Sequence, residues 1–261
     1  MERAEKAIQY YQYRSTESGP DQGEAYSGET IVEKPVSLTV NGEVWLTFMC
    51  TPVDLEALAA GFLFNEGVIT DRSEVASVHV CGRGDNVDVW LHHPVEQPSR
   101  WRRTSGCTGG FTSVEGRLPS PSLNGDCLNP EQVCSLIGEL FENQELYRRT
   151  GGVHTSALSD GERILFTADD IGRHNTLDKL AGRCLLEGIQ LERRLILTTG
   201  RISSEMLQKA ARQGAAVVIS RTSPSSLSIE MAQAWGITLI GYARRGRFNL
   251  YTHPERILAT A

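Results

Sequence analysis

The stretch LILTTGRISSEMLQKAARQGAAVVISRTSPSSLSIEMAQAWGITLIGY, residues 195–242, contains three short apolar runs separated by two amphipathic segments. The apolar runs cover 195–199, 215–220 and 237–242, and the amphipathic segments cover 203–213 and 225–235. Short apolar runs that alternate with helices are typical of parallel strands with helices packed on both faces. The stretch therefore predicts an α/β fold built on a parallel sheet.

The preceding segments extend this domain. Asn129 and Pro130 are typical of a helix N-terminus, and we expect the helix that they open to end at Gly151. The runs 153–158 and 163–167 predict a β-hairpin, and an apolar face from about Arg173 to Gly188 predicts another helix. Together these elements predict one three-layer domain over residues 129–255.

The N-terminal half divides differently. Residues 1–28 are polar and predict a flexible arm. Residues 29–115 predict a smaller α+β subdomain that ends in a cysteine-containing loop, and residues 116–128 predict a linker to the larger domain.

Turn and cap residues place the elements of this subdomain. Asn41-Gly42 lies between two apolar runs and predicts a hairpin. Thr51-Pro52 predicts the start of a helix, with Thr51 as N-cap, and Gly67 predicts its end. The runs 78–80 and 87–91 predict a second hairpin.

Composition excludes several classes of protein. Hydrophobic residues make up 40% and charged residues 22% of the 261 residues, which argues against bulk disorder. No apolar run approaches the about 20 residues of a membrane helix, and the polar N-terminus has no signal-peptide core. The net charge of −6 disfavours a nucleic-acid coat. We therefore expect a cytoplasmic protein with neither membrane nor nucleic acid as partner.

Basic residues gather where the predicted parallel strands end. The segment from Leu195 to His253 has seven basic and two acidic residues. Arginines follow each apolar run, namely Arg201, Arg221, and the group Arg244, Arg245 and Arg247. Ligands of parallel α/β sheets bind at this edge, and arginine and helix N-termini both favour phosphate. We expect a phosphorylated, nucleotide-like ligand there; the alternative is a solvated rim of arginines.

One cysteine differs from the other five. Cys107 lies in a loop rich in Gly, Ser and Thr, just after Arg100, Arg102 and Arg103. Nearby cations favour the thiolate, so Cys107 is a candidate nucleophile, and the alternative is an incidental exposed thiol. The other cysteines are interpreted as packing residues or free thiols, because no CxxC pair or zinc-ribbon spacing occurs.

Two histidines are open to two interpretations. His154 and His174 are candidates for catalysis or for structural hydrogen bonding. Asp169 and Asp170 stand just before the helix that starts near Arg173, and an Asp at this turn is interpreted as a helix cap.

Four motifs together resemble the FdhD/NarQ family, the formate dehydrogenase accessory sulfur carriers. They are GGVHT at 151–155, DIGRHNTLDK at 170–179, GRISSEM at 200–206 and GYARRGRFN at 241–249. The resemblance covers about residues 28 to 255, with the motifs in the right order. It implies a fold similar to that of cytidine deaminases and a homodimer.

The resemblance also implies a function. Family members pass persulfide sulfur from a cysteine desulfurase to the molybdenum cofactor bis(molybdopterin guanine dinucleotide), before insertion into the catalytic subunit of formate dehydrogenase. By position, the persulfide cysteine is Cys107. The family's stretch that binds the GDP-like part of the cofactor matches Tyr242, Ala243, Arg244, Arg245, Gly246 and Arg247.

One departure from the family pattern limits the chemistry. Many members carry CxxC in the cysteine loop, and here the fourth position is Gly110. Because this motif has no second thiol to release sulfur by forming a disulfide, sulfur is expected to leave only to an acceptor.

Two other functions are considered. A non-enzymatic chaperone would bind and deliver the guanine dinucleotide cofactor without sulfur chemistry. A deaminase-like hydrolase would need a zinc site with His or Cys near Glu and a PCxxC motif. Residues 200–206 contain no cysteine, and Thr176 stands where Glu would follow His174, so no metal site is expected.

Overall fold

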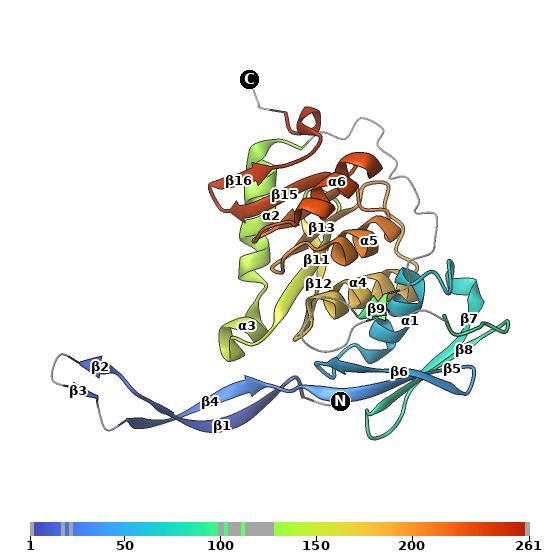
Figure 1. Cartoon of the computed structure of the whole chain (residues 1–261), viewed down its shortest axis with the longest axis horizontal. Helices are drawn as coiled ribbons and strands as arrows, with labels where there is room; N and C mark the ends of the chain where they lie inside the picture. Colours follow the sequence, from blue (N-terminus) through green and yellow to red (C-terminus); the bar gives the residue numbers. More distant parts are fainter. Residues whose placement is uncertain are drawn as a thin grey trace.

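A six-stranded sheet forms the centre of the larger unit (Figure 1). The structure, a computed structural model, describes residues 3–16, 19–20, 23–98, 102–103, 111–112 and 128–258. The strand order is β12-β11-β13-β14-β15-β16. The strands are β11 (His154–Ser159), β12 (Ile164–Asp170), β13 (Leu195–Thr198), β14 (Val217–Ser220), β15 (Thr238–Arg244) and β16 (Arg247–Leu250).

The sheet is mixed rather than wholly parallel. Strands β13, β14 and β15 are parallel to one another, as predicted, whereas β11, β12 and β16 join as antiparallel strands. The predicted hairpin of β11 and β12 is confirmed. The fold is therefore mixed α/β, and its likeness to cytidine deaminases stays a prediction.

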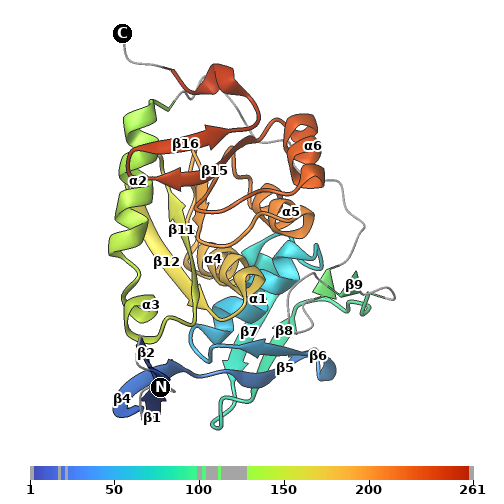
Figure 2. The ribbon, with the colours of Figure 1, turned by 60° about the vertical axis from the view of Figure 1, so that its left-hand side comes forward.

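Helices cover both faces of this sheet (Figure 2). The four helices are α2 (Pro130–Glu142) on one face and α4 (Arg173–Glu187), α5 (Ser204–Arg212) and α6 (Ser226–Trp235) on the other. Leu195 and Leu197 belong to the core beneath α2, and Ile196 belongs to the core beneath the other three helices. Because alternate side chains of β13 enter two different cores, every residue of the strand is buried.

A four-stranded sheet and one helix form the smaller unit. The sheet has the order β6-β5-β8-β7. Its elements are β5 (Lys34–Val40), β6 (Glu43–Cys50), α1 (Leu55–Asn65), β7 (Val75–Val80) and β8 (Asn86–Leu91). Asn41 and Gly42 have φ values of 49° and 89° and form the two-residue turn between β5 and β6, so the predicted hairpin is confirmed.

Helix α1 begins later than predicted. Its N-cap is Asp54, which adopts a left-handed conformation and caps no backbone N–H with its side chain. Thr51 lies before the helix, and its hydroxyl accepts a hydrogen bond from the backbone N–H of Ile171. The predicted cap is thus wrong, and Thr51 takes part in a contact between the two units that sequence spacing does not reveal.

The predicted helix after Asn129 is two helices. Asn129 and Gln132 form a reciprocal capping box at the start of α2, as the cap prediction requires. The helix stops at Glu142, and α3 (Glu145–Thr150) follows and ends at Gly151, which has a φ of 67°. Gln144 between the two helices is buried.

An antiparallel ribbon precedes the smaller unit. The sequence predicts a flexible arm over residues 1–28, whereas β1 (Glu5–Gln12) pairs along its whole length with β4 (Glu24–Ile31). Arg149 of α3 forms ion pairs with Glu5 and Glu29 at the base of the ribbon. The remaining short elements are β2 (Ser15–Thr16), β3 (Gly19–Pro20), β9 (Arg102–Arg103), β10 (Phe111–Thr112) and the 3-10 helices η1 (Arg72–Glu74) and η2 (Pro254–Arg256). Among the described residues, no helix has the length and apolar character needed to cross a bilayer.

The two units meet where α1 crosses α4 (Figure 1). A Cβ atom on Gly61 of α1 would lie 1.8 Å from the carbonyl oxygen of Asp178, and a Cβ atom on Gly182 of α4 would lie 1.8 Å from that of Ala57. Both neighbours are backbone atoms of the facing helix. The helices can therefore approach to this distance only with glycine at both positions.

Buried charges lie beside this crossing. Lys209 of α5 donates to both carboxylate oxygens of Asp178 and to Glu66. Although burial opposes a charge there, the carboxylates of Asp178 and Glu66 raise the pKa of Lys209. Asn65 donates a further hydrogen bond to Asp178. These partners fix α1, α4 and α5 relative to one another.

The glycine crossing makes a testable prediction about stability. Gly61→Ala and Gly182→Ala are each expected to lower the free energy of unfolding by about 3 kcal/mol, because the added methyl group forces two helix backbones apart. Urea unfolding monitored by circular dichroism measures the change.

Gly138 in α2 provides the matched control. It is also a helical glycine, but its added Cβ would meet only Arg245 at an ordinary 3.7 Å. Gly138→Ala is expected to be neutral or to stabilise by up to about 1 kcal/mol. Equal stabilities of the Gly61→Ala and Gly138→Ala variants would show that the crossing is not close.

Candidate functional site

A cleft of about 450 Å³ lies at the edge of the larger sheet where the parallel strands end. Thr199 follows β13, Arg221 and Thr222 follow β14, and Arg244 ends β15. The other wall comes from α3, the turn before β11 and the turn after β12. This wall is lined by Gln144, Tyr147, Gly151, Gly152, Val153, His154 and Ile171. The cleft therefore occupies the edge at which sequence analysis expects a ligand.

Two arginines give the cleft its charge. The guanidinium of Arg221 lies 5.1 Å from the ring centroid of Phe141, which holds it in a cation–π contact. Nη1 of Arg244 donates to the carbonyl oxygens of Arg221 and Ala243. The lining residues include no carboxylate. An anion that binds in the cleft would lie near the guanidinium groups of Arg221 and Arg244, and no carboxylate among the described lining residues would repel it.

The other predicted ligand-binding residues are placed differently. Sequence analysis expects a loop after residue 242, but β15 continues to Arg244 and turns through Arg245 and Gly246 into β16. The residues after the turn alternate in type and burial and form the antiparallel edge strand. The expected strand-end loop is thus a β-hairpin.

This hairpin spreads the predicted residues over several environments. Arg245 forms an exposed ion pair with Glu142 at 2.9 Å, and Arg247 is exposed on β16. Ala243 is buried, whereas Tyr242 is exposed with a φ of 51° at the irregularity in the pairing of β15 with β16. Of the predicted stretch, only Arg244 lines the cleft. The ligand-binding roles of the others stay predictions.

His154 is the histidine among the described residues that line the cleft. It begins β11, lines the cleft, and places Nδ1 3.4 Å from the hydroxyl of Thr199. Burial and the positive charges of Arg173 and Arg201 lower the pKa of His154, with Asp170 acting against them. The imidazole is therefore neutral at pH 7.

His174 lies deeper, in the first turn of α4. Burial and the charges of Arg173 and Lys209 lower its pKa to about 3. Its Nε2 atom lies 4.0 Å from Oε2 of Glu205, which is beyond hydrogen-bond distance, and both atoms are buried. His174 is therefore a neutral buried histidine whose Nε2 has no hydrogen-bond partner, and both interpretations of this residue stay predictions.

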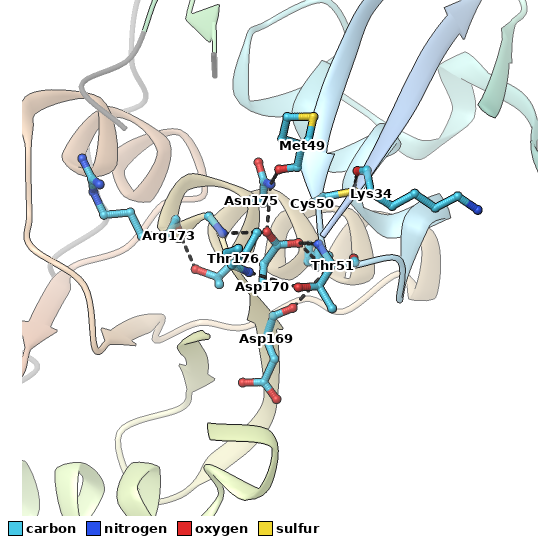
Figure 3. A network of polar contacts seen from close by, with 12 residues as sticks. Lys34, Met49, Cys50, Thr51, Asp169, Asp170, Arg173, Asn175 and Thr176 are labelled. Atoms are coloured by element: carbon cyan, nitrogen blue, oxygen red, sulfur yellow. Dashed lines mark hydrogen bonds and ion pairs between the residues drawn. The ribbon is translucent and has the colours of Figure 1, made fainter. Parts of the chain in front are cut away.

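Asp170 has more partners than the predicted helix cap would have (Figure 3). One carboxylate oxygen accepts from the backbone N–H of Gly172 and from the side chain of Asn175. The other accepts from the backbone N–H of Thr51 and lies 2.7 Å from Nζ of Lys179. The N-cap position of α4 belongs to Gly172. Asp170 thus connects the two units, which its place in the sequence does not reveal.

The candidate nucleophile Cys107 lies outside the described residues, as do Gly110 and the residues between them. Of the described cysteines, Cys50 and Cys184 are buried, in agreement with packing roles, and Cys81 and Cys134 are partly exposed. In the part of the chain that the structure describes, no three His, Cys, Asp or Glu side chains form a group fit for a metal ion.

Comparison with known proteins gives one consistent result. The model of the FdhD/NarQ family matches residues 31–258. A relative named sulfur carrier protein FdhD from Bacillus subtilis is 39% identical over 246 residues, covering 91% of this chain and 94% of its own length. A relative of the same name from Staphylococcus aureus strain MRSA252 is 37% identical, covering 87% of this chain and 89% of its own length.

A solved structure agrees with these relatives. The crystal structure of a protein described as a formate dehydrogenase accessory protein from Desulfotalea psychrophila superposes with a TM-score of 0.77 at 31% identity. The match covers 97% of this chain and 99% of the other.

The buried histidine makes a prediction about pH. Since the pKa of His174 is about 3 in the folded chain and about 6.5 in the unfolded chain, only the unfolded chain binds this proton between those values. Its contribution to stability is thus present above pH 6.5 and is lost as pH falls. From pH 7 to pH 5 the wild type is expected to lose about 2 kcal/mol more than His174→Gln.

Urea unfolding at both pH values measures this difference. His79→Gln, at an exposed position of β7, is the control and is expected to retain the wild-type dependence. If His174→Gln showed the same loss as the wild type, the histidine would not be buried in its neutral form.

Proposed function

Because the chain belongs to the FdhD/NarQ family, we propose that it is a sulfur carrier for formate dehydrogenase. It receives sulfur from the persulfide of a cysteine desulfurase and passes it to the molybdenum cofactor bis(molybdopterin guanine dinucleotide). Its partners are the desulfurase, the catalytic subunit of formate dehydrogenase and a second copy of the chain, in the cytoplasm. The observation that carries the proposal is the arginine-lined cleft at the edge of the sheet.

The proposed sulfur step takes place at Cys107. Its thiolate attacks the terminal sulfur of the desulfurase persulfide, a new sulfur–sulfur bond forms on Cys107, and the desulfurase cysteine leaves as a thiolate. The arginines that precede Cys107 in sequence favour its thiolate form. Because Gly110 replaces a second thiol, the sulfur stays on Cys107 until an acceptor arrives.

The cleft provides the proposed place for the nucleotide end of the cofactor. A guanosine diphosphate group carries two phosphates, and Arg221 and Arg244 supply two positive charges at the rim. The backbone of Gly151 and Gly152 forms part of the opposite wall. In this arrangement the nucleotide is held by fixed charges while the molybdenum end reaches the sulfur donor, so that binding energy positions the reacting groups.

A chaperone without sulfur chemistry is the second candidate. It is favoured by one observation, that all the described residues that line the cleft belong to the larger unit. Such a protein would bind and deliver the cofactor equally well without Cys107. The two candidate functions therefore differ in the expected effect of removing the thiol of Cys107.

The first test changes the thiol. Cys107→Ala is expected to retain GDP binding and to lose both the extra sulfur atom and the restoration of formate dehydrogenase activity, because no other thiol in the loop replaces it. Mass spectrometry after incubation with a cysteine desulfurase and cysteine measures the bound sulfur.

Cys81→Ala, which removes a partly exposed thiol elsewhere, is the control and is expected to behave as the wild type. If Cys107→Ala restored formate dehydrogenase activity in full, the persulfide role would be wrong and the chaperone would be the better account.

The second test changes the cleft. Arg221→Ala and Arg244→Ala are each expected to weaken GDP binding by about tenfold, since each removes a charge-assisted contact to phosphate. Isothermal titration calorimetry of the full chain measures the affinity. Arg83→Ala, in an exposed turn of the smaller unit, is the matched control and is expected to leave it unchanged.

The predicted stretch is tested by the same titration. If removing Arg245 and Arg247 weakened GDP binding while Arg221→Ala and Arg244→Ala did not, the nucleotide would bind at the hairpin of β15 and β16 and not in the cleft.

A further inference from the structure

The hydroxyl of Thr199 lies between two nitrogen atoms at the edge of the cleft. Its oxygen accepts a hydrogen bond from the backbone N–H of Thr155 at 3.1 Å. The same oxygen lies 3.4 Å from Nδ1 of His154. The backbone N–H of Thr199 in turn donates to the carbonyl of Thr155, so that the two chain segments are held together by backbone as well as side chain.

This arrangement offers Nδ1 of His154 a hydroxyl donor. A hydroxyl group has one proton to donate, and the backbone N–H of Thr155 uses the oxygen only as an acceptor. Among the described contacts of Thr199, Nδ1 of His154 is the one acceptor that its proton reaches. When the Thr199 hydroxyl donates this proton to Nδ1, the proton of the neutral ring stays on Nε2.

The second ring nitrogen then carries the hydrogen that the neutral ring can donate. His154 lines the cleft and is partly exposed, and Nε2 has no hydrogen-bond partner among the described residues. The lowered pKa of His154, caused by burial and by Arg173 and Arg201, agrees with a ring that does not take up a second proton at pH 7. The cleft thus combines two arginines with a neutral imidazole.

We propose that neutral His154 donates a hydrogen bond from Nε2–H to a phosphate oxygen of the ligand in the cleft, and that Thr199 is the positioning residue that fixes this tautomer. The inference rests on the proposed function, because it takes the ligand to be a diphosphate. The arginines supply the charge that attracts the ligand. His154 supplies a hydrogen-bond donor of fixed direction. This donor favours an anion whose oxygen atom lies at the right place, such as a phosphate, over an anion held by charge alone.

The tautomer is measured directly by nitrogen NMR of the full chain labelled at histidine, with the His154 signals assigned by their loss in His154→Asn. The wild type is expected to show a protonated Nε2 and an unprotonated Nδ1 at pH 7. Thr199→Val is expected to shift the ring toward the other tautomer, and Thr199→Ser, which keeps the hydroxyl, to restore it. A wild-type ring protonated at Nδ1 would overturn the inference.

The ligand contact is measured by GDP titration of paired variants. His154→Gln places an amide nitrogen near the position of Nε2 and is expected to keep most of the affinity, whereas His154→Asn places its amide near Nδ1 and is expected to lose about tenfold. His79→Gln is expected to bind as the wild type.

The outcomes separate the inference from the proposed function. If the wild type binds GDP and His154→Asn binds it equally well, the inference is wrong while the proposed function stands. If the wild type does not bind GDP, the nucleotide site and the His154 contact are both wrong, whatever the tautomer is.

Discussion

The close crossing of α1 and α4 is the constraint on which the rest of the structure depends. Gly61 and Gly182 let the two helix backbones meet, and the buried ammonium of Lys209 joins them through Asp178 and Glu66. A buried charge that lost its partner would be strongly destabilising, so these groups are held as a set. The crossing fixes the smaller unit against the larger sheet.

Asp170 connects the interface between the two units to the cleft. This carboxylate holds Thr51 of the smaller unit and Lys179 of α4, and it lies opposite His154 in the pairing of β11 with β12. The contact between the units therefore helps to fix the position of β11, the strand that begins with His154. A site that depends on the direction of one hydrogen bond needs such support, because small displacements weaken it steeply.

Local patterns predict the elements better than the contacts between them. The strand and helix alternation after Leu195, the Asn41-Gly42 turn and the Asn129 cap are each decided by neighbours in sequence, and the structure contains them. Thr51 and Asp170 look like helix caps in sequence, but each uses its side chain across the interface between the units.

The edge strand β16 is not predicted from the sequence. Its alternation of exposed and half-buried residues is only four residues long and directly follows an arginine-rich turn, so that the whole segment resembles a loop. Arg221 and Arg244 are brought together by β14 and β15, and no spacing in the sequence shows that Arg245 turns toward Glu142.

In the proposed function, the cofactor accepts sulfur while its nucleotide end occupies the cleft. This coupling is measured by the rate at which radioactive sulfur passes, in a single turnover, from the persulfide-loaded chain to the molybdenum cofactor in the presence of increasing GDP. GDP is expected to slow the transfer in step with its occupancy of the cleft and to leave the sulfur on Cys107. An unchanged rate at saturating GDP would contradict this coupling.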